Sequence, residues 1–392
     1  MSRATASLTE QDVAVLVDAW PVGRPRSIEA LGSDSNNHNW VIRTPTETYF
    51  LRVYRNVDAE TRIAFEHPLL QALAKSGLPF AVPSPLPITS GETLARFNGA
   101  IASLTREIPG RHPKSGDVSA ARACAAALGS LDTALASIEI ENRVPGGSGY
   151  ADLWNVHSAL MGPGEALTLL QLAGSERVAY EQAVSETESA WPALAASLPT
   201  QIIHSDYVRR NVLLLDGAVS GVLDFEFSGP DLRAMDLAVG IYHFCLSNWI
   251  GRDASLISEL VWAFVEGFSE TMKLSRDEFE TLPLLLLRRQ LVVSLHWLGR
   301  WKVGLSSEAD ARERITGLSD LQRWLKGEGA EVLEHYAHIL ARSPEQTANG
   351  PGSRSAGIVT RIRTLSGGST TMLSEGSEPM LEMDRGITTF MT

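Results

Sequence analysis

Four polar side chains flank apolar stretches that have the composition of buried β-strands. The stretch IIHSDYVRRN carries His204, Asp206 and Asn211, and VLDFEFSG carries Asp224 a little further along the chain. The segment between them, VLLLDGAVSGVLDF, has the pattern of an apolar hairpin with an Asp-Gly turn. Asp206 and Asn211 therefore share one loop, and Asp224 ends the returning strand. We expect these three side chains to converge at the mouth of a cleft.

Two carboxylates and one amide at a single point suit a hard cation such as Mg²⁺. Proteins bind Mg²⁺ through one or two carboxylates together with the phosphates of a substrate. The arrangement therefore indicates phosphoryl transfer. Taken singly, Asp206 could serve as a turn residue, Asn211 as a cap and Asp224 as the end of a strand. Their joint spacing favours the metal site.

The residues from His204 to Asn211 match the kinase pattern H-x-D-x-x-x-x-N, and DFE at 224–226 stands where protein kinases have D-F-G. This stretch resembles the aminoglycoside phosphotransferase and choline kinase family, and most nearly its bacterial homoserine-kinase-like branch. The resemblance implies that Asp206 accepts or orients the proton of the substrate hydroxyl. It also implies that Asn211 and Asp224 hold Mg²⁺ against the phosphates of ATP.

The segment after Asp224 distinguishes small-molecule kinases from protein kinases. Only EFSGP separates the metal-binding strand end from DLRAMDLAVGIYHF, which has the pattern of a helix with Asp231 as its N-cap. A protein kinase needs a longer segment here to dock a peptide, and no A-P-E motif is present. The resemblance implies that His204 is architectural and that Asp236, one turn into the helix, braces the catalytic loop by hydrogen bonds. We therefore expect a small-molecule acceptor.

The strand lysine that holds the α- and β-phosphates in kinases is missing. Residues 1–108 contain a single lysine, Lys75, at the end of a predicted helix. Arg52 in ETYFLRVYR aligns with the strand lysine, and an arginine there resembles many members of the family. Because arginine is always charged and can grip phosphate oxygens with two nitrogens, the resemblance implies that Arg52 binds the nucleotide with Glu66 as its partner. The alternative is an exposed strand arginine.

Two further segments resemble the nucleotide site of the family. The loop GSDSNNH would cover the phosphates, with Ser33 and its neighbours offering backbone amides in place of glycines. The strand-to-linker junction at Arg106, Glu107 and Ile108 would contact adenine through backbone groups. The weak glycine loop and the missing lysine leave open a nucleotide-binding pseudokinase as a second class of function. The intact acid and metal-binding residues favour the enzyme.

The candidate acceptor contacts suit acceptors of different charge. Glu226, Asp231 and Asp132 suit a cation, whereas Arg300 suits a carboxylate. Trp297 and Arg300 lie on a predicted late helix that resembles the one near the acceptor pocket of the homoserine-kinase-like branch, and Asp132 stands where relatives usually have a histidine. The expected acceptor is a homoserine-like hydroxy amino acid or an amino alcohol, phosphorylated on its hydroxyl, with an aminoglycoside antibiotic as the alternative.

The periodicity of the chain predicts the α+β, two-lobe architecture that a protein-kinase-like fold implies. Residues 1–107 are predicted to form a small β-rich N-lobe with one inserted helix at 59–77. Residues 108–343 are predicted to form a larger, mainly helical C-lobe, and 344–392 a disordered tail rich in Ser, Thr and Gly. Further helices are predicted at 8–20, 117–137, 148–160, 175–197, 231–247, 254–272, 276–302 and 307–342.

Composition limits the partners of this chain of 392 residues. Its net charge of −12 argues against nucleic acid, because no basic stripe is present to release counterions from phosphates. Cys124 and Cys245 lie in apolar helical contexts and are predicted to be buried free thiols of a reducing compartment. No apolar stretch approaches the roughly 20 residues of a membrane span. We expect a cytoplasmic enzyme without a membrane partner, and the oligomeric state stays open.

Overall fold

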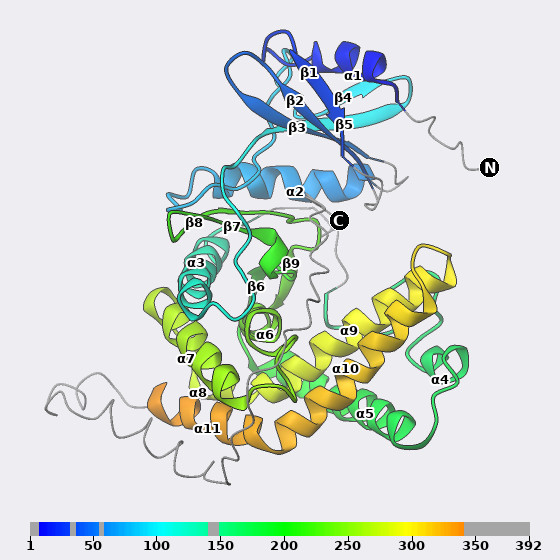
Figure 1. Cartoon of the computed structure of the whole chain (residues 1–392), viewed down its shortest axis with the longest axis vertical. Coiled ribbons are helices and arrows are strands. Elements are labelled where there is room, and N and C mark those ends of the chain that lie inside the picture. The colour runs from blue at the N-terminus through cyan, green and yellow to red at the C-terminus, as the bar shows by residue number, and fades with distance from the viewer. Residues whose placement is uncertain (1–7, 32–36, 55–58, 140–148, 341–392) are drawn as a thin grey trace, which may run out of the picture.

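The chain folds into two lobes that lie one above the other in Figure 1. The computed structural model describes residues 8–31, 37–54, 59–139 and 149–340. The small lobe contains a five-stranded sheet, and the large lobe consists mainly of helices. The predicted two-lobe α+β architecture is thus confirmed. The predicted boundary between residues 107 and 108 stays a prediction, and the predicted tail at 344–392 lies outside the described residues.

The small lobe is one antiparallel sheet with the strand order β1-β2-β3-β5-β4. Helix α1 packs its apolar side on this sheet and begins at a capping box, in which Thr9 and Asp12 each bond the backbone N–H of the other. Helix α2 lies beneath the sheet, and its Phe65 and Leu69 join the core of the large lobe (Figure 1). The elements are α1 Glu10–Val17, β1 Ser27–Ala30, β2 His38–Arg43, β3 Thr48–Tyr54, α2 Ala59–Leu73, β4 Ala95–Phe97 and β5 Ala100–Arg106.

The large lobe is built mainly from helices packed around one apolar core. Its α-helices are α3 Val118–Leu135, α4 Glu165–Leu169, α5 Gly174–Ser197, α6 Ala234–Ile241, α7 Ala254–Thr271, α8 Arg276–Glu280, α9 Leu282–Lys302, α10 Glu308–Lys326 and α11 Glu328–Leu340. A π-helical turn at Tyr242–Leu246 continues α6. Both cysteines are buried free thiols in this core, as predicted.

Two short strand pairs at the top of the large lobe position the polar residues of the central motif. Strand β6 Thr200–Ile203 pairs with β9 Gly229–Leu232, and β7 Val212–Leu215 pairs with β8 Ala218–Val222. The predicted hairpin turn is confirmed, because Asp216 and Gly217 have φ values of 52° and 82°. Two successive left-handed residues are the signature of a type I′ turn, which suits Asp-Gly.

The predicted helix at 148–160 is wrong. From Gly149 to Leu160 the chain forms turns instead. Oδ1 of Asp152 accepts a hydrogen bond from the backbone N–H of Trp154 at 2.8 Å, and Nδ1 of His157 accepts one from the N–H of Ala159 at 3.2 Å. Side chains that bond nearby backbone N–H groups compete with the helical pattern, so apolar spacing alone misled the prediction.

Three other helix predictions need correction, one at its start and two in their interior. The helix expected from Asp231 begins at Ala234, because Asp231 belongs to β9 and does not cap a helix. The helix expected at 276–302 is divided at Thr281, where Pro283 falls in the first turn of α9 and disfavours a continuous helix. The helix expected at 307–342 is divided at Gly327.

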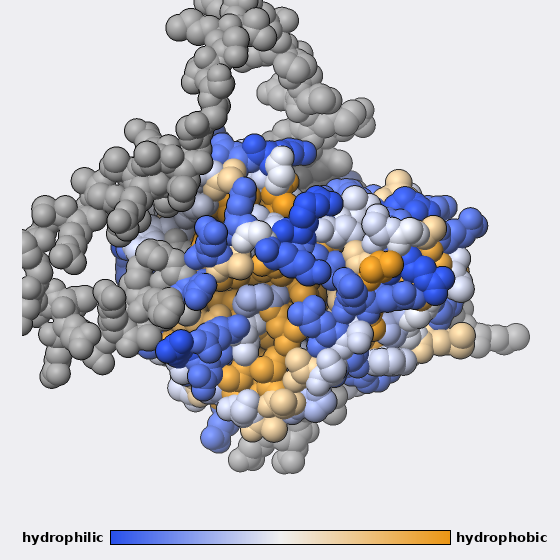
Figure 2. Space-filling view, turned by 90° about the horizontal axis from the view of Figure 1, so that it is seen from below, coloured by the Kyte–Doolittle hydropathy of each residue, from blue (hydrophilic) through white to orange (hydrophobic). Residues whose placement is uncertain are grey.

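Apolar side chains also reach the surface of the large lobe. Seen from below, this lobe shows a band of hydrophobic residues between hydrophilic rims (Figure 2). Within the described ranges, no helix combines the length and the apolar character that crossing a membrane requires.

Candidate active site

The catalytic loop between β6 and β7 is held by side chains on both sides. Asp236 of α6 accepts hydrogen bonds from the backbone N–H groups of His204 and Ser205, at 2.5 and 2.8 Å. Nδ1 of His204 accepts from the N–H of Asp206 at 3.2 Å, so its Nε2 carries the proton and donates to the carbonyl of Leu223 at 2.9 Å. These contacts tie the loop to the chain just after β8.

Ser205 has a left-handed backbone, with a φ of 69°. This conformation is costly for a residue with a side chain and persists where the surroundings enforce it. Asp236 holds the N–H of Ser205, and the hydroxyl of Tyr150 donates to its carbonyl at 2.6 Å. The peptide that precedes Asp206 is therefore fixed from two directions.

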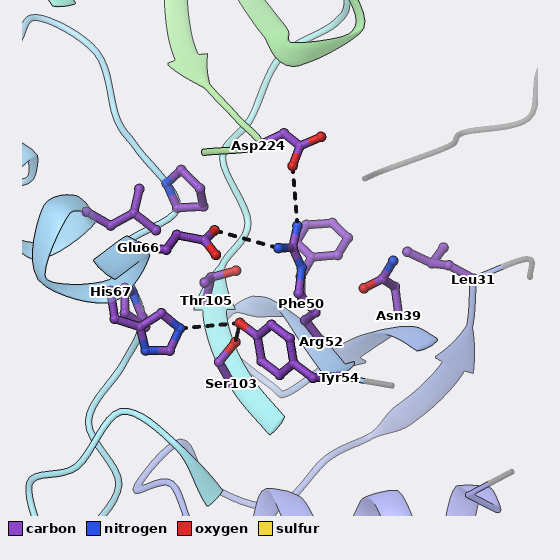
Figure 3. Close-up of a pocket in the computed structure, with 13 residues that line it drawn as sticks. Leu31, Asn39, Phe50, Arg52, Tyr54, Glu66, His67, Ser103, Thr105 and Asp224 are labelled. Carbon is purple, nitrogen blue, oxygen red and sulfur yellow. Dashed lines mark hydrogen bonds and ion pairs between the residues drawn. The ribbon is translucent and has the colours of Figure 1, made fainter. Parts of the chain in front are cut away.

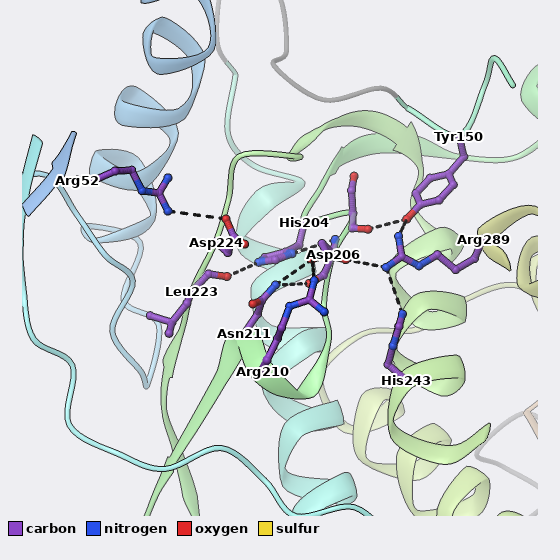
Figure 4. Close-up of polar contacts among 11 residues, drawn as sticks. Arg52, Tyr150, His204, Asp206, Arg210, Asn211, Leu223, Asp224, His243 and Arg289 are labelled. Atoms are coloured by element: carbon purple, nitrogen blue, oxygen red, sulfur yellow. Dashed lines mark hydrogen bonds and ion pairs between the residues drawn. The ribbon is translucent and has the colours of Figure 1, made fainter. Parts of the chain in front are cut away.

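Asp206 is buried and surrounded by donors (Figure 4). Nη2 of Arg289 lies 2.6 Å from Oδ1, while Nδ2 of Asn211 and Nη2 of Arg210 lie 3.1 and 3.2 Å from Oδ2. Burial acts to raise the pKa of Asp206, but Arg289 and Arg210 outweigh burial and hold that pKa below its usual range. Asp206 is therefore a carboxylate that can accept a hydrogen bond from a hydroxyl group.

Arg289 of α9 is a site residue that the sequence-based prediction missed. Its Nη1 donates to the hydroxyl of Tyr150 at 2.8 Å, and its Nη2 lies 3.2 Å from Nε2 of His243. The available signal was the shared helix face of Arg289, His296 and Arg300, which are seven and four positions apart in a segment rich in apolar residues. Nothing comparable marked Tyr150, which lies in the segment mistaken for a helix.

Asp224 is 1% exposed and has a left-handed φ of 64°. Among the described residues, neither of its carboxylate oxygens accepts a hydrogen bond, and Nη2 of Arg52 lies 3.9 Å from Oδ1. Burial and then the charge of Glu226 raise the pKa of Asp224. A buried carboxylate without hydrogen bonds is costly, so these oxygens are suited to a ligand that brings positive charge.

The residues around Asp224 fit Mg²⁺. Asn211 uses its Nδ2 to donate to Asp206, at 2.9 Å to the carbonyl and 3.1 Å to Oδ2, which leaves its amide oxygen for a ligand. A carboxylate and an amide oxygen are hard donors of the kind that Mg²⁺ prefers. Within the described part of the chain, no three or more His, Cys, Asp or Glu side chains form a metal-binding group. A metal bound here would therefore rely largely on phosphate and water oxygens.

A cavity beneath the sheet of the small lobe joins Arg52 and Glu66 to Asp224 (Figure 3). Nη1 of Arg52 lies 3.6 Å from Oε1 of Glu66. Each of these two residues is 7% exposed, so the alternative of an exposed strand arginine is wrong. The other lining residues come from the small lobe and the connection after α2: Leu31, Asn39, Phe50, Tyr54, His67, Leu70, Pro83, Pro85, Ser103 and Thr105.

The remaining predicted nucleotide contacts do not line this cavity. Ser33 lies outside the described residues. Arg106 pairs with Glu47 on the surface, and the N–H of Glu107 donates to the carbonyl of Thr48 at 3.0 Å. Ile108 packs over Gly221. The contact of this junction with adenine stays a prediction.

A second cavity, of about 1450 Å³, lies on the large-lobe side of Asp206. Glu226, Trp297 and Arg300, which were predicted as acceptor contacts, line it. The structure does not bring Asp231 to this cavity, because its carboxylate accepts hydrogen bonds from the N–H groups of Tyr150 and Leu232, at 2.7 and 2.8 Å. Asp132 is also absent from the acceptor wall and is fully buried in α3.

A two-lobed fold with a cavity beneath the small-lobe sheet, a catalytic loop and a buried carboxylate defines the class of protein-kinase-like phosphotransferases. Residues 27–265 match the phosphotransferase enzyme family. Because this match covers more than half of the chain, the protein belongs to that family. It is therefore a phosphotransferase for small molecules.

Homoserine kinases are among its curated relatives. The chain is 28% identical to the homoserine kinase of Acidiphilium cryptum (strain JF-5) over 287 residues, which covers 71% of this chain and 82% of that protein. It is 27% identical to the homoserine kinase of Rhizobium meliloti (strain 1021) over 316 residues, which covers 79% of this chain and 91% of that protein.

Solved structures share the fold at lower identity. The amicoumacin kinase hAmiN, in complex with AMP-PNP and Ca²⁺, matches with a TM-score of 0.60 at 15% identity, over 81% of this chain and 94% of that chain. A microcompartment-associated aminopropanol kinase also matches with a TM-score of 0.60 at 15% identity, over 81% and 98% of the two chains. An aminoglycoside phosphotransferase from Alicyclobacillus acidocaldarius matches with a TM-score of 0.58 at 15% identity, over 85% and 99%.

Proposed function

We propose that this protein is an ATP- and Mg²⁺-dependent O-phosphotransferase that phosphorylates the hydroxyl of a homoserine-like hydroxy amino acid. The observation that carries the proposal is the placement of two aspartates. Asp224 lines the cavity under the small-lobe sheet, and Asp206 lines the cavity of the large lobe. Asn211 connects the two aspartates. Its Nδ2 donates to Asp206, and its amide oxygen would bind the metal together with Asp224. A phosphoryl group transferred from a nucleotide in the first cavity to an acceptor in the second would move between Asp224 and Asp206.

Positioning and electrostatics supply most of the catalysis in phosphoryl transfer. Asp206 would accept a hydrogen bond from the acceptor hydroxyl and orient its oxygen toward the γ-phosphate. Arg52, oriented by Glu66, would hold phosphate oxygens. Asp224 and Asn211 would hold Mg²⁺, which neutralises phosphate charge when bound. A cytoplasmic location, where ATP and Mg²⁺ are available, belongs to the same proposal.

The charges of the acceptor cavity favour a zwitterion. Its lining includes six arginines and five acids; the arginines are Arg209, Arg210, Arg289, Arg300, Arg312 and Arg314. Burial lowers the pKa of His243 and His296, and the neighbouring Arg289 and Arg300 lower it further, so both rings are neutral at neutral pH. A hydroxy amino acid would satisfy both signs of charge. A polycationic aminoglycoside would meet these arginines unfavourably.

The test is ADP release from MgATP with matched acceptors: L-homoserine, its carboxamide, an amino alcohol and an aminoglycoside. We expect the highest kcat/KM for L-homoserine and a loss with the carboxamide, which removes only the negative charge. Asp206→Asn is the control and should lose about 10²–10⁴ in turnover while it still binds MgATP. Preference for the amino alcohol or the aminoglycoside would replace the proposed acceptor. Nucleotide binding without turnover on any acceptor would support the pseudokinase.

A further inference from the structure

Two aspartates lie together beneath the catalytic loop. Asp132 of α3 and Asp236 of α6 are both 0% exposed. Asp236 accepts the two backbone N–H groups of the loop, from His204 and Ser205. In the described part of the chain, neither oxygen of Asp132 accepts a hydrogen bond, and the carboxyl of Asp236 lies within hydrogen-bonding reach of it. Two ionised carboxylates cannot bond each other, because each is only an acceptor.

Such a pair carries a proton, because two adjacent negative charges are not stable inside a protein. The surroundings decide which carboxyl holds it. Asp236 receives two N–H donors, which stabilise its ionised form, whereas Asp132 receives none. Burial and then the charge of Asp236 raise the pKa of Asp132.

The other charged and titratable groups nearby do not neutralise Asp132. Arg233 faces it from the start of α6 but donates to Glu278 at 2.6 and 2.7 Å. His204 is neutral because burial lowers its pKa. Burial raises the pKa of Tyr207 well above its usual range, so its hydroxyl is also neutral. The side chain of Gln201 donates to the backbone carbonyl of Asp132, at 2.9 Å. Among the described residues it donates no hydrogen bond to the carboxyl group of Asp132.

We propose that Asp132 is a protonated positioning residue. Its carboxyl O–H donates to Asp236 and thereby holds Asp236 in the position from which it accepts the N–H groups of the catalytic loop. Asp236 then has three donors, which hold it against the left-handed peptide at Ser205 that precedes Asp206. The effect on turnover rests on the proposed role of Asp206. The protonation of Asp132 does not depend on that role.

This arrangement predicts a stability that falls as the pH rises from the unfolded pKa of an aspartate, about 3.9, toward the raised pKa of folded Asp132. A carboxyl whose folded-state pKa is raised contributes stability that is complete below its unfolded pKa and is lost as the pH rises through the folded pKa. Above that point Asp132 would be a second anion against Asp236 and would weaken the brace. Asp132→Asn keeps the size and a donor but cannot ionise, so it should remove this dependence.

Infrared spectroscopy of the nucleotide-free protein at neutral pH tests the protonation. The difference between wild type and Asp132→Asn should contain the carbonyl stretch of a protonated carboxylic acid, and its absence would overturn the proposal. As the pH is raised from about 5, unfolding midpoints should fall more steeply for wild type than for Asp132→Asn. Asp117→Asn, at the N-cap of the same helix, is the matched control and should keep the wild-type profile. Identical profiles for wild type and Asp132→Asn would also overturn it.

Kinetics test the positioning role separately. Asp132→Ala should lower kcat by about tenfold with little change in the KM for ATP, because one hydrogen bond to a charged group is lost away from the nucleotide. Asp132→Asn should recover kcat. An unchanged kcat in Asp132→Ala would exclude the positioning role. The infrared and unfolding results need no turnover, so they stand even if the proposed acceptor is wrong.

Discussion

Arg289 and Asp206 form a buried ion pair, in which Nη2 of the arginine lies 2.6 Å from Oδ1 of the aspartate. The pair joins α9 to the catalytic loop across 83 positions of sequence. Because Arg289 also donates to the hydroxyl of Tyr150, its guanidinium group is fixed on two sides. The late helix therefore sets the direction in which the carboxylate of Asp206 points.

Replacing Arg289 should impair turnover more than nucleotide binding. Arg289→Met keeps the apolar length of the side chain and removes its charge, so Asp206 loses its strongest orienting contact. We expect kcat to fall by about 10- to 100-fold, which corresponds to the loss of one charge-assisted hydrogen bond. Steady-state kinetics in ATP and acceptor measure the change. Arg289→Lys should recover part of it, and an equal loss in both variants would argue for a packing defect.

Asp224→Asn should separate stability from metal binding. The substitution replaces a buried carboxyl group whose oxygens have no hydrogen-bond partner among the described residues and whose ionisation is disfavoured by burial, so the ligand-free protein should unfold at the same or a higher temperature. The increase in melting temperature that MgATP gives wild type should disappear. Calorimetry with MgATP, and with ATP in the presence of a chelator, measures the metal dependence directly. Unchanged MgATP affinity in the variant would exclude Asp224 as the ligand.

Arg52→Ala should weaken ATP binding and turnover together, because its phosphate contact would exist in both the ground state and the transition state. Arg52→Lys should restore part of both, since the ammonium group keeps the electrostatic attraction but cannot form the bidentate hydrogen bonds of arginine. Arg43→Ala on the neighbouring strand is the control, because Arg43 pairs with Glu29 at 48% side-chain exposure. Equal effects of Arg43→Ala and Arg52→Ala would mean that the loss reflects damage to the sheet.

The predictable part of the site is the part encoded in short stretches of sequence. The catalytic loop, the hairpin and the end of β8 span 204–224, where strand pattern and turn residues predict the structure without knowledge of distant contacts. Arg52 and Glu66 lie only 14 positions apart, on a strand and the helix that follows it. For these two residues, the resemblance to kinases, which pair a strand cation with a helix glutamate, was enough to predict which side chains meet.

The missed residues come together only through packing of the whole large lobe. Tyr150 reaches the loop from a segment whose apolar spacing suggested a helix, and Asp231 positions Tyr150 instead of contacting the acceptor cavity. Asp132 has a side chain typical of the protein surface but is fully buried in α3. Sequence periodicity describes one element at a time, so it cannot show which helix faces the loop.

The final prediction concerns Arg233 and Glu278, which join the start of α6 to α8. The carboxylate of Glu278 is fully buried and accepts two hydrogen bonds from Arg233, at 2.6 and 2.7 Å, and one from the N–H of Ser275 at 2.8 Å. Burial acts to raise the pKa of Glu278, but these donors outweigh it and lower that pKa. A lowered folded-state pKa means that the pair stabilises the protein above the unfolded pKa of about 4.3. The contribution is lost as the pH falls through the folded pKa.

Glu278→Gln should therefore destabilise the protein at neutral pH and much less in acid. The amide keeps the shape and one acceptor but leaves Arg233 without its counter-ion, which should cost about 3 kcal/mol, the lower end for breaking a buried pair, because Arg233 is partly exposed. Urea unfolding from pH 7 down to about pH 2, which passes through the lowered folded pKa, measures the difference between variant and wild type. The control is Glu280→Gln on the same helix, whose exposed pair with Arg276 should contribute under about 1 kcal/mol at any pH. A difference for Glu278→Gln that stays constant as the pH falls would show that the ionised carboxylate is not the source of the stability.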